Sequence, residues 1–154
     1  MRALADHEAA FAVVGGAAVG LQGSARTTLD LDVCYERSKE NVARVAAALR
    51  PLCPRLRGAP EGLPFHLDAD TLERGLNFTL ETDAGAIDLL GEITGIGGYA
   101  AVLALCDTLP AYGLRLQVLS LDGLERAKLA TGRFKDLLDV AEIRAVRDQR
   151  CGKV

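Results

Sequence analysis

The sequence predicts an α/β (α+β) fold in which helices flank a mixed β-sheet. Three observations lead to this prediction: apolar runs of strand length recur along the chain, capped helical periodicities fill its last third, and no repeat or low-complexity segment interrupts the pattern. We expect one domain over residues 1–154, with C-terminal helices over about 121–149 packing on it.

The first part of the chain alternates short apolar runs with glycine-rich turns. The run FAVV ends at Gly15-Gly16, which is typical of a buried strand that leads into a tight turn. The expected elements are a helix that ends near residue 9, a strand over 11–14, a short helix over 17–22, a loop over 23–27 and a strand over 29–35.

The middle of the chain contains one capped helix, one irregular stretch and a hairpin. Ser38 is a suitable N-cap for a helix over about 39–49, which Pro51 and Pro54 end. Residues 51–64 are expected to form a surface loop. Two strand-like runs over 75–81 and 86–90, separated by Asp-Ala-Gly, predict a hairpin.

The last third predicts a strand over 114–119 and helices over about 97–105, 121–131 and 134–147. Ser120 caps the second helix, and Gly132 separates it from the last one. Helical spacing predicts that one apolar stripe buries the last helix; its members are Phe134, Leu137, Leu138, Ala141 and Ala145.

Composition excludes several classes of protein. Apolar residues make up 49% and charged residues 25% of the chain, as in ordinary globular proteins. The net charge of -3 provides no global field that attracts nucleic acid. Aromatic residues make up only 5%, and Trp is absent, so we expect no strong nucleic-acid patch built on stacking or on a basic stripe.

Targeting and redox signals point to a cytoplasmic protein. The first ten residues carry acids and no long apolar run, so we expect no signal peptide, and no apolar stretch approaches the length of a membrane span. The four cysteines form no CxxC pair, which argues against a zinc site and favours reduced thiols.

The acids of the 29–35 strand carry the chemical signal. Asp30 and Asp32 are two residues apart, so on an extended chain their side chains leave the same face. Two such carboxylates repel each other, and a divalent cation with oxygen preference removes that conflict. Asp88 lies in an otherwise apolar run and reaches the same site if the two strands are neighbours.

Three carboxylates around two magnesium ions suit in-line phosphoryl or nucleotidyl transfer, and Asp88 is then also a candidate base. Gly15 and Gly16 allow a phosphate to approach the backbone closely at a helix start. The turn is neither a GxxxxGK[ST] loop nor a GxGxxG loop.

Together these residues resemble the nucleotidyltransferase superfamily of the polymerase-β type, in its minimal form. The form GG-x-A-x(n)-G-x-x-R-x-T-x-D-x-D also occurs in proteins that resemble abortive-infection toxins and in some aminoglycoside nucleotidyltransferases. The matching residues here are Gly15, Gly16, Ala18, Gly23, Arg26, Thr28, Asp30 and Asp32. A C-terminal stretch, KLATGRFKDLLD, starting at Lys128 resembles a tail common in this group.

The resemblance implies a polymerase-β-like fold and specific roles. Asp30, Asp32 and Asp88 are the implied catalytic and magnesium-binding residues. The implied nucleotide-binding residues are Gly15, Gly16, Arg26, Thr28 and Lys128. One departure is Gly16, where many members carry a serine whose hydroxyl binds phosphate. The chain also lacks the large helical domain that many members use for acceptor binding, so a partner protein is a further expectation.

Plainer interpretations stand beside these roles. Asp30 and Asp32 are alternatively solvated acids of an edge strand, and Asp88 is alternatively an acid paired with an arginine. Arg26 contacts either phosphate or a carboxylate, and Lys128 is either solvated or in contact with the nucleotide. The residues Arg133, Lys135, Asp136 and Asp139 have the pattern of a solvated helix face.

The leading functional expectation is a magnesium-dependent enzyme that moves a nucleoside monophosphate from a nucleoside triphosphate (ATP or another) to a hydroxyl of an RNA, a protein or a small molecule, with release of pyrophosphate. The alternative is a weak or inactive module of the same fold that acts with a partner, as in a toxin–antitoxin pair. A metal-dependent phosphohydrolase is a third reading. The fold alone does not decide among them.

Overall fold

The computed structural model describes residues 1–25, 27–60 and 62–152. Over these residues the chain forms a seven-stranded mixed sheet in the order β3-β4-β5-β2-β1-β9-β8, and a small pair β6-β7. The strands are β1 (Phe11–Val14), β2 (Asp30–Tyr35), β3 (Arg55–Leu56), β4 (Asn77–Thr82), β5 (Gly85–Leu90), β6 (Glu92–Ile93), β7 (Gly97–Gly98), β8 (Cys106–Ala111) and β9 (Leu114–Leu119).

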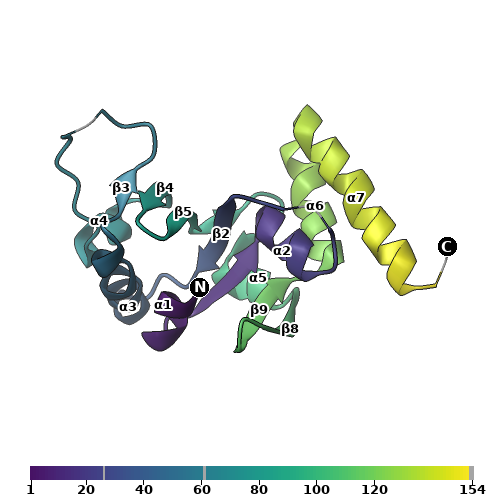
Figure 1. Ribbon diagram of the computed structural model, residues 1–154, viewed down its shortest axis with the longest axis horizontal. Coiled ribbons are helices and arrows are strands. Elements are labelled where there is room, and N and C mark those ends of the chain that lie inside the picture. Colours follow the sequence, from purple (N-terminus) through teal and green to yellow (C-terminus); the bar gives the residue numbers. More distant parts are fainter. Residues whose placement is uncertain (26, 61, 153–154) are drawn as a thin grey trace.

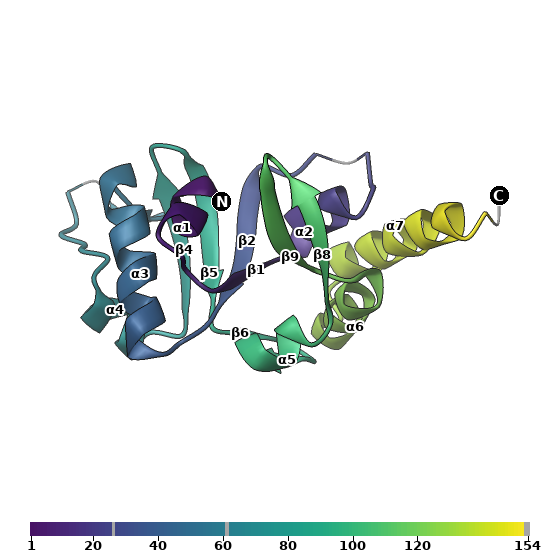
Figure 2. The ribbon, with the colours of Figure 1, turned by 90° about the horizontal axis from the view of Figure 1, so that it is seen from below.

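Helices lie at both ends of the sheet (Figure 1, Figure 2). In Figure 2, α1, α3 and α4 gather beside β4 and β5, whereas α6 and α7 lie at the other end, beyond α2. The helices are α1 (Arg2–Asp6), α2 (Gly15–Leu21), α3 (Lys39–Leu49), α4 (Ala69–Arg74), α5 (Tyr99–Leu103), α6 (Leu121–Thr131) and α7 (Phe134–Arg150), with a 3₁₀ turn over Arg50–Leu52.

The central strands combine both pairing directions. β1 pairs antiparallel with β2 and parallel with β9, and β2 pairs parallel with β5. Parallel neighbours need a long crossover; between β2 and β5 it includes α3, β3, α4 and β4. β4 and β5 form the expected hairpin, in which Thr82 lies opposite Gly85.

The core explains why only one end of β2 is available for chemistry. All four residues of β1 are buried, as expected for a strand covered on both faces. In β2, Val33, Cys34 and Tyr35 have 0% exposure, whereas residues 30–32 are only partly buried. The polar start of β2 therefore lies at the margin of the core, where charged side chains remain in contact with solvent.

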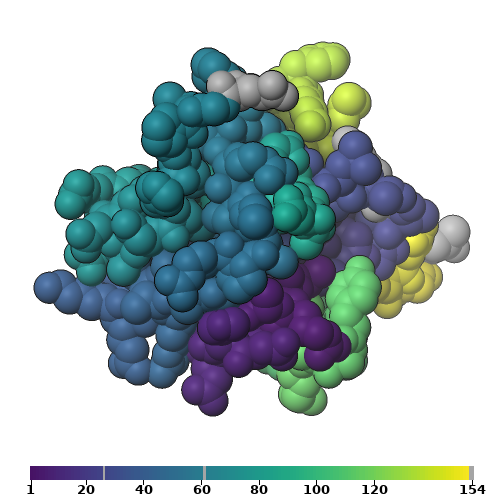
Figure 3. Space-filling view, turned by 60° about the vertical axis from the view of Figure 1, so that its left-hand side comes forward, coloured from purple at the N-terminus to yellow at the C-terminus, as the bar shows by residue number. Residues whose placement is uncertain are grey.

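A buried asparagine joins α3 to the segment before β1. Asn41 donates from Nδ2 to the carbonyl oxygens of Ala10, at 3.0 Å, and Glu36, at 2.7 Å. Its Oδ1 accepts the amide of Ala10 at 2.6 Å. Ser38 caps α3 through the amide of Asn41, at 3.2 Å. In Figure 3, the purple N-terminal segment lies directly against the blue segment that includes α3.

The prediction for the last helix was wrong about its buried face. Phe134, Leu137 and Leu138 are 81%, 51% and 61% exposed. The residues of α7 that are buried are Asp136, Asp139, Val140, Ile143 and Val146. Two aspartates on the buried face conceal this register from a search for apolar periodicity. The prediction that Arg133, Lys135, Asp136 and Asp139 form a solvated helix face was therefore also wrong for Asp136 and Asp139.

The expected strands β1, β2, β4, β5 and β9 and the helices α3 and α6 are present, but several other elements were missed or misplaced. β6 and β7 were not predicted, and Gly97–Gly98 forms β7 rather than the start of the helix expected over 97–105. The stretch 51–64 includes β3 as well as loop, and α4 and β8 were not predicted. β8 contains Pro110, which is tolerated because β8 is an edge strand of the sheet. The helix α2 starts at Gly15 rather than at residue 17.

No helix within the described ranges is both long and apolar enough to span a bilayer.

The corrected register of α7 predicts a contrast between two single substitutions. Ile143→Ala removes a side chain with 0% exposure, and we expect it to lower the free energy of unfolding by about 2–5 kcal/mol. Leu138→Ala, at a position 61% exposed, should change it by less than about 0.5 kcal/mol. Urea denaturation of both variants measures the free energy of unfolding. A larger loss of stability in Leu138→Ala than in Ile143→Ala would show that the apolar stripe predicted from the sequence is the buried face after all.

Candidate functional site

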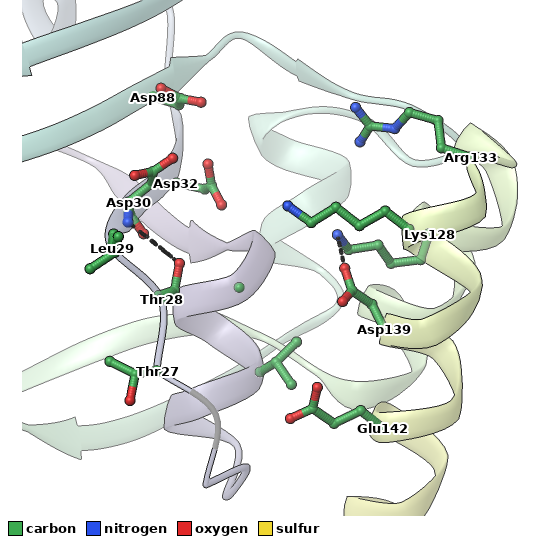
Figure 4. A pocket seen from close by; sticks show the side chains of 13 residues that line it. Thr27, Thr28, Leu29, Asp30, Asp32, Asp88, Lys128, Arg133, Asp139 and Glu142 are labelled. Atoms are coloured by element: carbon green, nitrogen blue, oxygen red, sulfur yellow. Dashed lines mark hydrogen bonds and ion pairs between the residues drawn. The ribbon is translucent and has the colours of Figure 1, made fainter.

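Three aspartates lie side by side where β2 and β5 run parallel. Asp32 is directly opposite Asp88, and Asp30 is opposite Ala86. Paired residues of neighbouring strands point to the same face and lie about 4.8 Å apart. Asp30 is two residues before Asp32, so it shares this face. We call Asp30, Asp32 and Asp88 the carboxylate cluster; Figure 4 shows the three side chains together.

The neighbouring strands shift the pKa values of two members. Burial raises the pKa of Asp32, the negative charge of Asp88 raises it further, and a hydrogen bond from the Gly16 amide acts in the opposite direction. Burial also raises the pKa of Asp88, against the lowering effect of Arg57. Burial is the largest cause of both upward pKa shifts, and neighbouring carboxylates add to it.

Among the residues that the structure describes, Arg57 contacts the cluster directly through its guanidinium. Its Nη1 lies 3.2 Å from Asp30 Oδ2, and its Nη2 lies 3.0 Å from Asp88 Oδ1. Its Nε lies 3.2 Å from Glu81 Oε1. The plain interpretation of Asp88, an acid paired with an arginine, therefore holds in this structure. Sequence reasoning missed Arg57 because it assigned residues 51–64 to a surface loop.

The strand register brings Arg57 to the cluster. Leu56 of β3 is opposite Leu80 of β4, and one residue later the Arg57 amide donates to the carbonyl of Thr79 at 3.0 Å. Thr79 is opposite Asp88. Arg57, Thr79 and Asp88 therefore form one row across three strands. A basic residue one position after a two-residue strand, here Arg55–Leu56, is too common a pattern to have shown this.

The Gly15-Gly16 turn fits closely against Asp32. Gly15 adopts a φ of +59°, and a Cβ on it would lie 2.0 Å from Asp32 Oδ2. A Cβ on Gly16 would lie 3.1 Å from Thr28 Oγ1. The first glycine thus makes space for a carboxylate of the cluster, and the hydroxyl of Thr28 lies beside the second glycine.

Lys128 belongs to a buried ionic group between α6 and α7. Its Nζ lies 2.7 Å from Asp139 Oδ2 and 3.2 Å from Asp136 Oδ1. Asp136 is 1% exposed and also accepts hydrogen bonds from Thr131 Oγ1 at 2.6 Å and Arg133 Nε at 2.8 Å. The interpretation of Lys128 as a solvated lysine is therefore wrong, although its contact with a nucleotide stays a prediction.

Two clefts meet at the carboxylate cluster. The first, of about 460 Å³, is lined by the cluster together with Gly16, Thr28, Lys128 and Lys135, among others. Figure 4 shows Asp30, Asp32 and Asp88 on one side of it and Lys128, Arg133 and Asp139 on the other.

The second cleft, of about 610 Å³, is lined by the remaining glycine of the turn, Gly15, and by apolar residues that include Leu119 and Leu124. Four residues line both clefts: Asp32, Asp88, Lys128 and Arg133.

The residues predicted for the site thus gather around these clefts, with one exception. The cluster, Gly16, Thr28 and Lys128 line the first cleft, and Gly15 lines the second. Arg26 lies outside the described residues.

The cluster fits a hard divalent cation by its chemistry. All its donors are carboxylate oxygens on one face of two adjacent strands, as magnesium prefers. Asp88 Oδ1 is buried and lies 3.0 Å from Arg57 Nη2. As the side chains stand, however, no three acidic, histidine or cysteine residues within the described part of the chain converge closely enough to hold an ion.

Comparison with known proteins supports the fold alone. No protein-family model matches the chain, and no curated protein sequence matches it significantly. Among solved structures, the chain is similar to a candidate nucleotidyltransferase from Thermotoga maritima, with a TM-score of 0.57 and 16% identity. The match covers 92% of this chain and 88% of that one. The predicted nucleotidyltransferase-like α+β fold is therefore confirmed.

The turn predicts different costs for two glycines with similar backbone angles. Gly15→Ala should cost about 1–2 kcal/mol for the left-handed backbone and a further 1–3 kcal/mol, roughly, for the displaced Asp32 carboxylate. Gly132→Ala, with φ +64° and nothing within 4 Å of an added Cβ, should show only the first cost. Chemical denaturation compares them, and equal losses would contradict the close fit of Gly15 to Asp32.

The ionic group of α6 and α7 predicts an acid-sensitive stability. Burial alone would raise the pKa of Asp136, but hydrogen bonds from Arg133, Thr131 and Lys128 hold it well below its usual value. A depressed folded-state pKa contributes stability that is complete above the unfolded-state pKa of about 4 and is lost as pH falls towards the folded-state pKa.

Asp136→Asn should therefore lower the free energy of unfolding by roughly 3 kcal/mol at pH 7 and flatten its decline between about pH 5 and pH 2. Asp70→Asn is the control, because its pair with Arg74 is highly exposed at 78% and 81%. Denaturation curves at several pH values measure both variants. An unchanged acid slope in Asp136→Asn would show that Asp136 carries no such linkage.

Proposed function

We propose that the protein is a magnesium-dependent nucleotidyltransferase that transfers a nucleoside monophosphate from a nucleoside triphosphate to a hydroxyl acceptor. The observation that carries this proposal is the parallel register that sets Asp32 against Asp88, with Asp30 on the same face and the Gly15-Gly16 turn beside Asp32. Magnesium bound by these carboxylates would supply Lewis-acid stabilisation of the phosphate oxygens.

The first cleft suits the triphosphate. It combines the amide-bearing turn at Gly16 and the hydroxyl of Thr28 with the cationic side chains of Lys128, Arg133 and Lys135. Backbone N–H groups and cations are the usual ligands of phosphate oxygens. The hydroxyl of Thr28 lies where a side chain on Gly16 would extend, so we infer that it provides the contact that the missing serine makes in similar proteins.

The second cleft suits the acceptor. It reaches Asp32 and Asp88 from the side of Gly15, and its apolar wall of Leu119 and Leu124 favours a ligand with a non-polar surface over a second polyphosphate. An acceptor there would face the α-phosphorus of a triphosphate in the first cleft, because both clefts end at the same two carboxylates.

The reaction then follows from the positions of these groups. The acceptor oxygen attacks the α-phosphorus, the bond to the bridging oxygen breaks, and pyrophosphate leaves with the bonding electron pair. Asp88, which lines both clefts, takes the proton of the attacking hydroxyl. Lys128 and Arg133, which also line both clefts, are placed to balance charge on the leaving pyrophosphate.

An exposed apolar group favours a second candidate function, a module that acts with a protein partner. Four large hydrophobic residues of α6 and α7 are 49–81% exposed: Leu129, Phe134, Leu137 and Leu138. Surfaces of this kind often mark interaction sites. Under this reading the isolated chain would form a stable complex with its partner and would not bind a triphosphate with magnesium.

Asp32→Asn tests the enzymatic proposal. The assay uses ATP and each other nucleoside triphosphate in turn, labelled at the α-phosphate, with magnesium and a mixture of hydroxyl acceptors. The wild type should transfer the labelled nucleoside monophosphate to an acceptor and release unlabelled pyrophosphate. Asp32→Asn should reduce this rate at least about 100-fold, because it removes a charge needed at the reacting phosphate.

Asp83→Asn is the matched control, since Asp83 lies in the β4–β5 turn and pairs with Arg55 at an exposed position. It should retain the wild-type rate. Release of inorganic phosphate instead of pyrophosphate would identify a phosphohydrolase. Equal rates in Asp32→Asn and the wild type would rule out the cluster as the reacting site.

A further inference from the structure

We propose that Arg57 is a built-in counter-cation of the carboxylate cluster, and that its guanidinium must leave Asp30 and Asp88 before a divalent ion binds there. This inference rests on the proposed function, because it concerns the metal of the same site. It assigns to Arg57 the role of a positioning residue that sets how tightly the cluster binds its ion.

The contacts show that Arg57 engages the oxygens a metal would need. It lies 3.2 Å from Asp30 Oδ2 and 3.0 Å from Asp88 Oδ1, on two of the three members of the cluster. The side chains of Arg57 and Asp88 are only 28% and 22% exposed, so the pair is partly shielded from water. In this arrangement the three carboxylates do not converge on a common point within the described part of the chain.

Electrostatic repulsion prevents Arg57 and a divalent ion from binding the same carboxylates at the same time. A guanidinium and a divalent ion on the same carboxylate oxygens would repel each other strongly in a partly buried site. Asp88 Oδ1 is buried and lies 3.0 Å from Arg57 Nη2, so a divalent ion on this oxygen would occupy the position of that contact. Asp32, by contrast, is oriented by the Gly16 amide and is not the residue that Arg57 holds.

Glu81 provides an ion-pair partner for Arg57 after it leaves the cluster. Arg57 Nε lies 3.2 Å from Glu81 Oε1, and Glu81 is 48% exposed at the rim of the sheet. The Arg57 amide donates to the carbonyl of Thr79, and this backbone bond is kept when the side chain moves. Release of the cluster also breaks the hydrogen bond from Arg57 Nη2 to the carbonyl oxygen of Leu80, at 3.2 Å. Arg57 can therefore keep its pair with Glu81 while its two Nη atoms release Asp30 and Asp88.

Competition from Arg57 lowers the affinity of the cluster for a free metal ion. Only the fraction of molecules with Arg57 detached binds the ion, so the observed affinity is the intrinsic affinity multiplied by that fraction. A metal ion that arrives with a triphosphate would meet less opposition, because the phosphate charge provides Arg57 with an alternative partner.

Binding of Mn²⁺ alone, followed by the loss of its free-ion electron paramagnetic resonance signal, tests this inference without nucleotide or turnover. Arg57→Met keeps the aliphatic stem and removes the charge; it should bind Mn²⁺ about tenfold more tightly than the wild type. In chelator it should also melt at a lower temperature, because Asp30 and Asp88 then lack a counter-cation.

Two further variants distinguish displacement of Arg57 by the ion from a general effect of removing one positive charge. Arg55→Met removes an arginine two residues away that pairs with Asp83, and it should leave Mn²⁺ affinity unchanged. Arg57→Lys keeps the charge but its single ammonium cannot bridge Asp30, Asp88 and Glu81 together. Displacement predicts tighter Mn²⁺ binding in Arg57→Lys too, and this variant carries the test if Arg57→Met does not fold.

Two results would overturn the inference. If the wild type binds Mn²⁺ and both Arg57 variants bind it equally or more weakly, Arg57 does not compete with the ion, and the proposed enzymatic function is unaffected. If neither the wild type nor the Arg57 variants bind Mn²⁺, the metal site itself is absent, and the proposed function fails together with the inference.

Discussion

Three carboxylates on one face of two parallel strands impose the constraint on which the rest of this site depends. Asp32 is set against Asp88 by the backbone pairing of β2 and β5, and Asp30 follows from the two-residue period of the strand. Like charges this close are stable at the margin of a core only if cations or hydrogen-bond donors oppose them. Arg57, the Gly16 amide and Lys128 are the groups that oppose this charge.

The groups that oppose the negative charge of the cluster come from two sides of the site. On one side, the β3–β4–β5 register carries Arg57 to Asp30 and Asp88. Gly15, the left-handed first residue of α2, leaves room for the Asp32 carboxylate, which accepts a hydrogen bond from the Gly16 amide. On the other side, α6 and α7 present Lys128 across the first cleft, held in place by the buried Asp136 and Asp139. The aspartates of α7 therefore support a cation at the cleft, and this explains why charged residues occupy the buried face of that helix.

The sequence predicted the parts of this account that depend on local pattern. Alternation in β2, the Gly-Gly turn and the acid in β5 identified the cluster, and Ser38 and Ser120 correctly marked two helix starts. It failed where long-range pairing decides the outcome. Arg57 reaches the cluster only through the pairing of β3 with β4, and the buried side of α7 combines Val140, Ile143 and Val146 with two aspartates that pair with Lys128. A single sequence contains no signal for either contact.

The most direct test of the central claim, that this cluster holds a catalytic metal, is diffraction from crystals grown with Mn²⁺ and a non-hydrolysable nucleoside triphosphate. We predict anomalous density for manganese between Asp30, Asp32 and Asp88, with the triphosphate in the first cleft near Gly16 and Lys128. A triphosphate bound elsewhere, or a cluster that still pairs with Arg57 and holds no manganese, would contradict the claim.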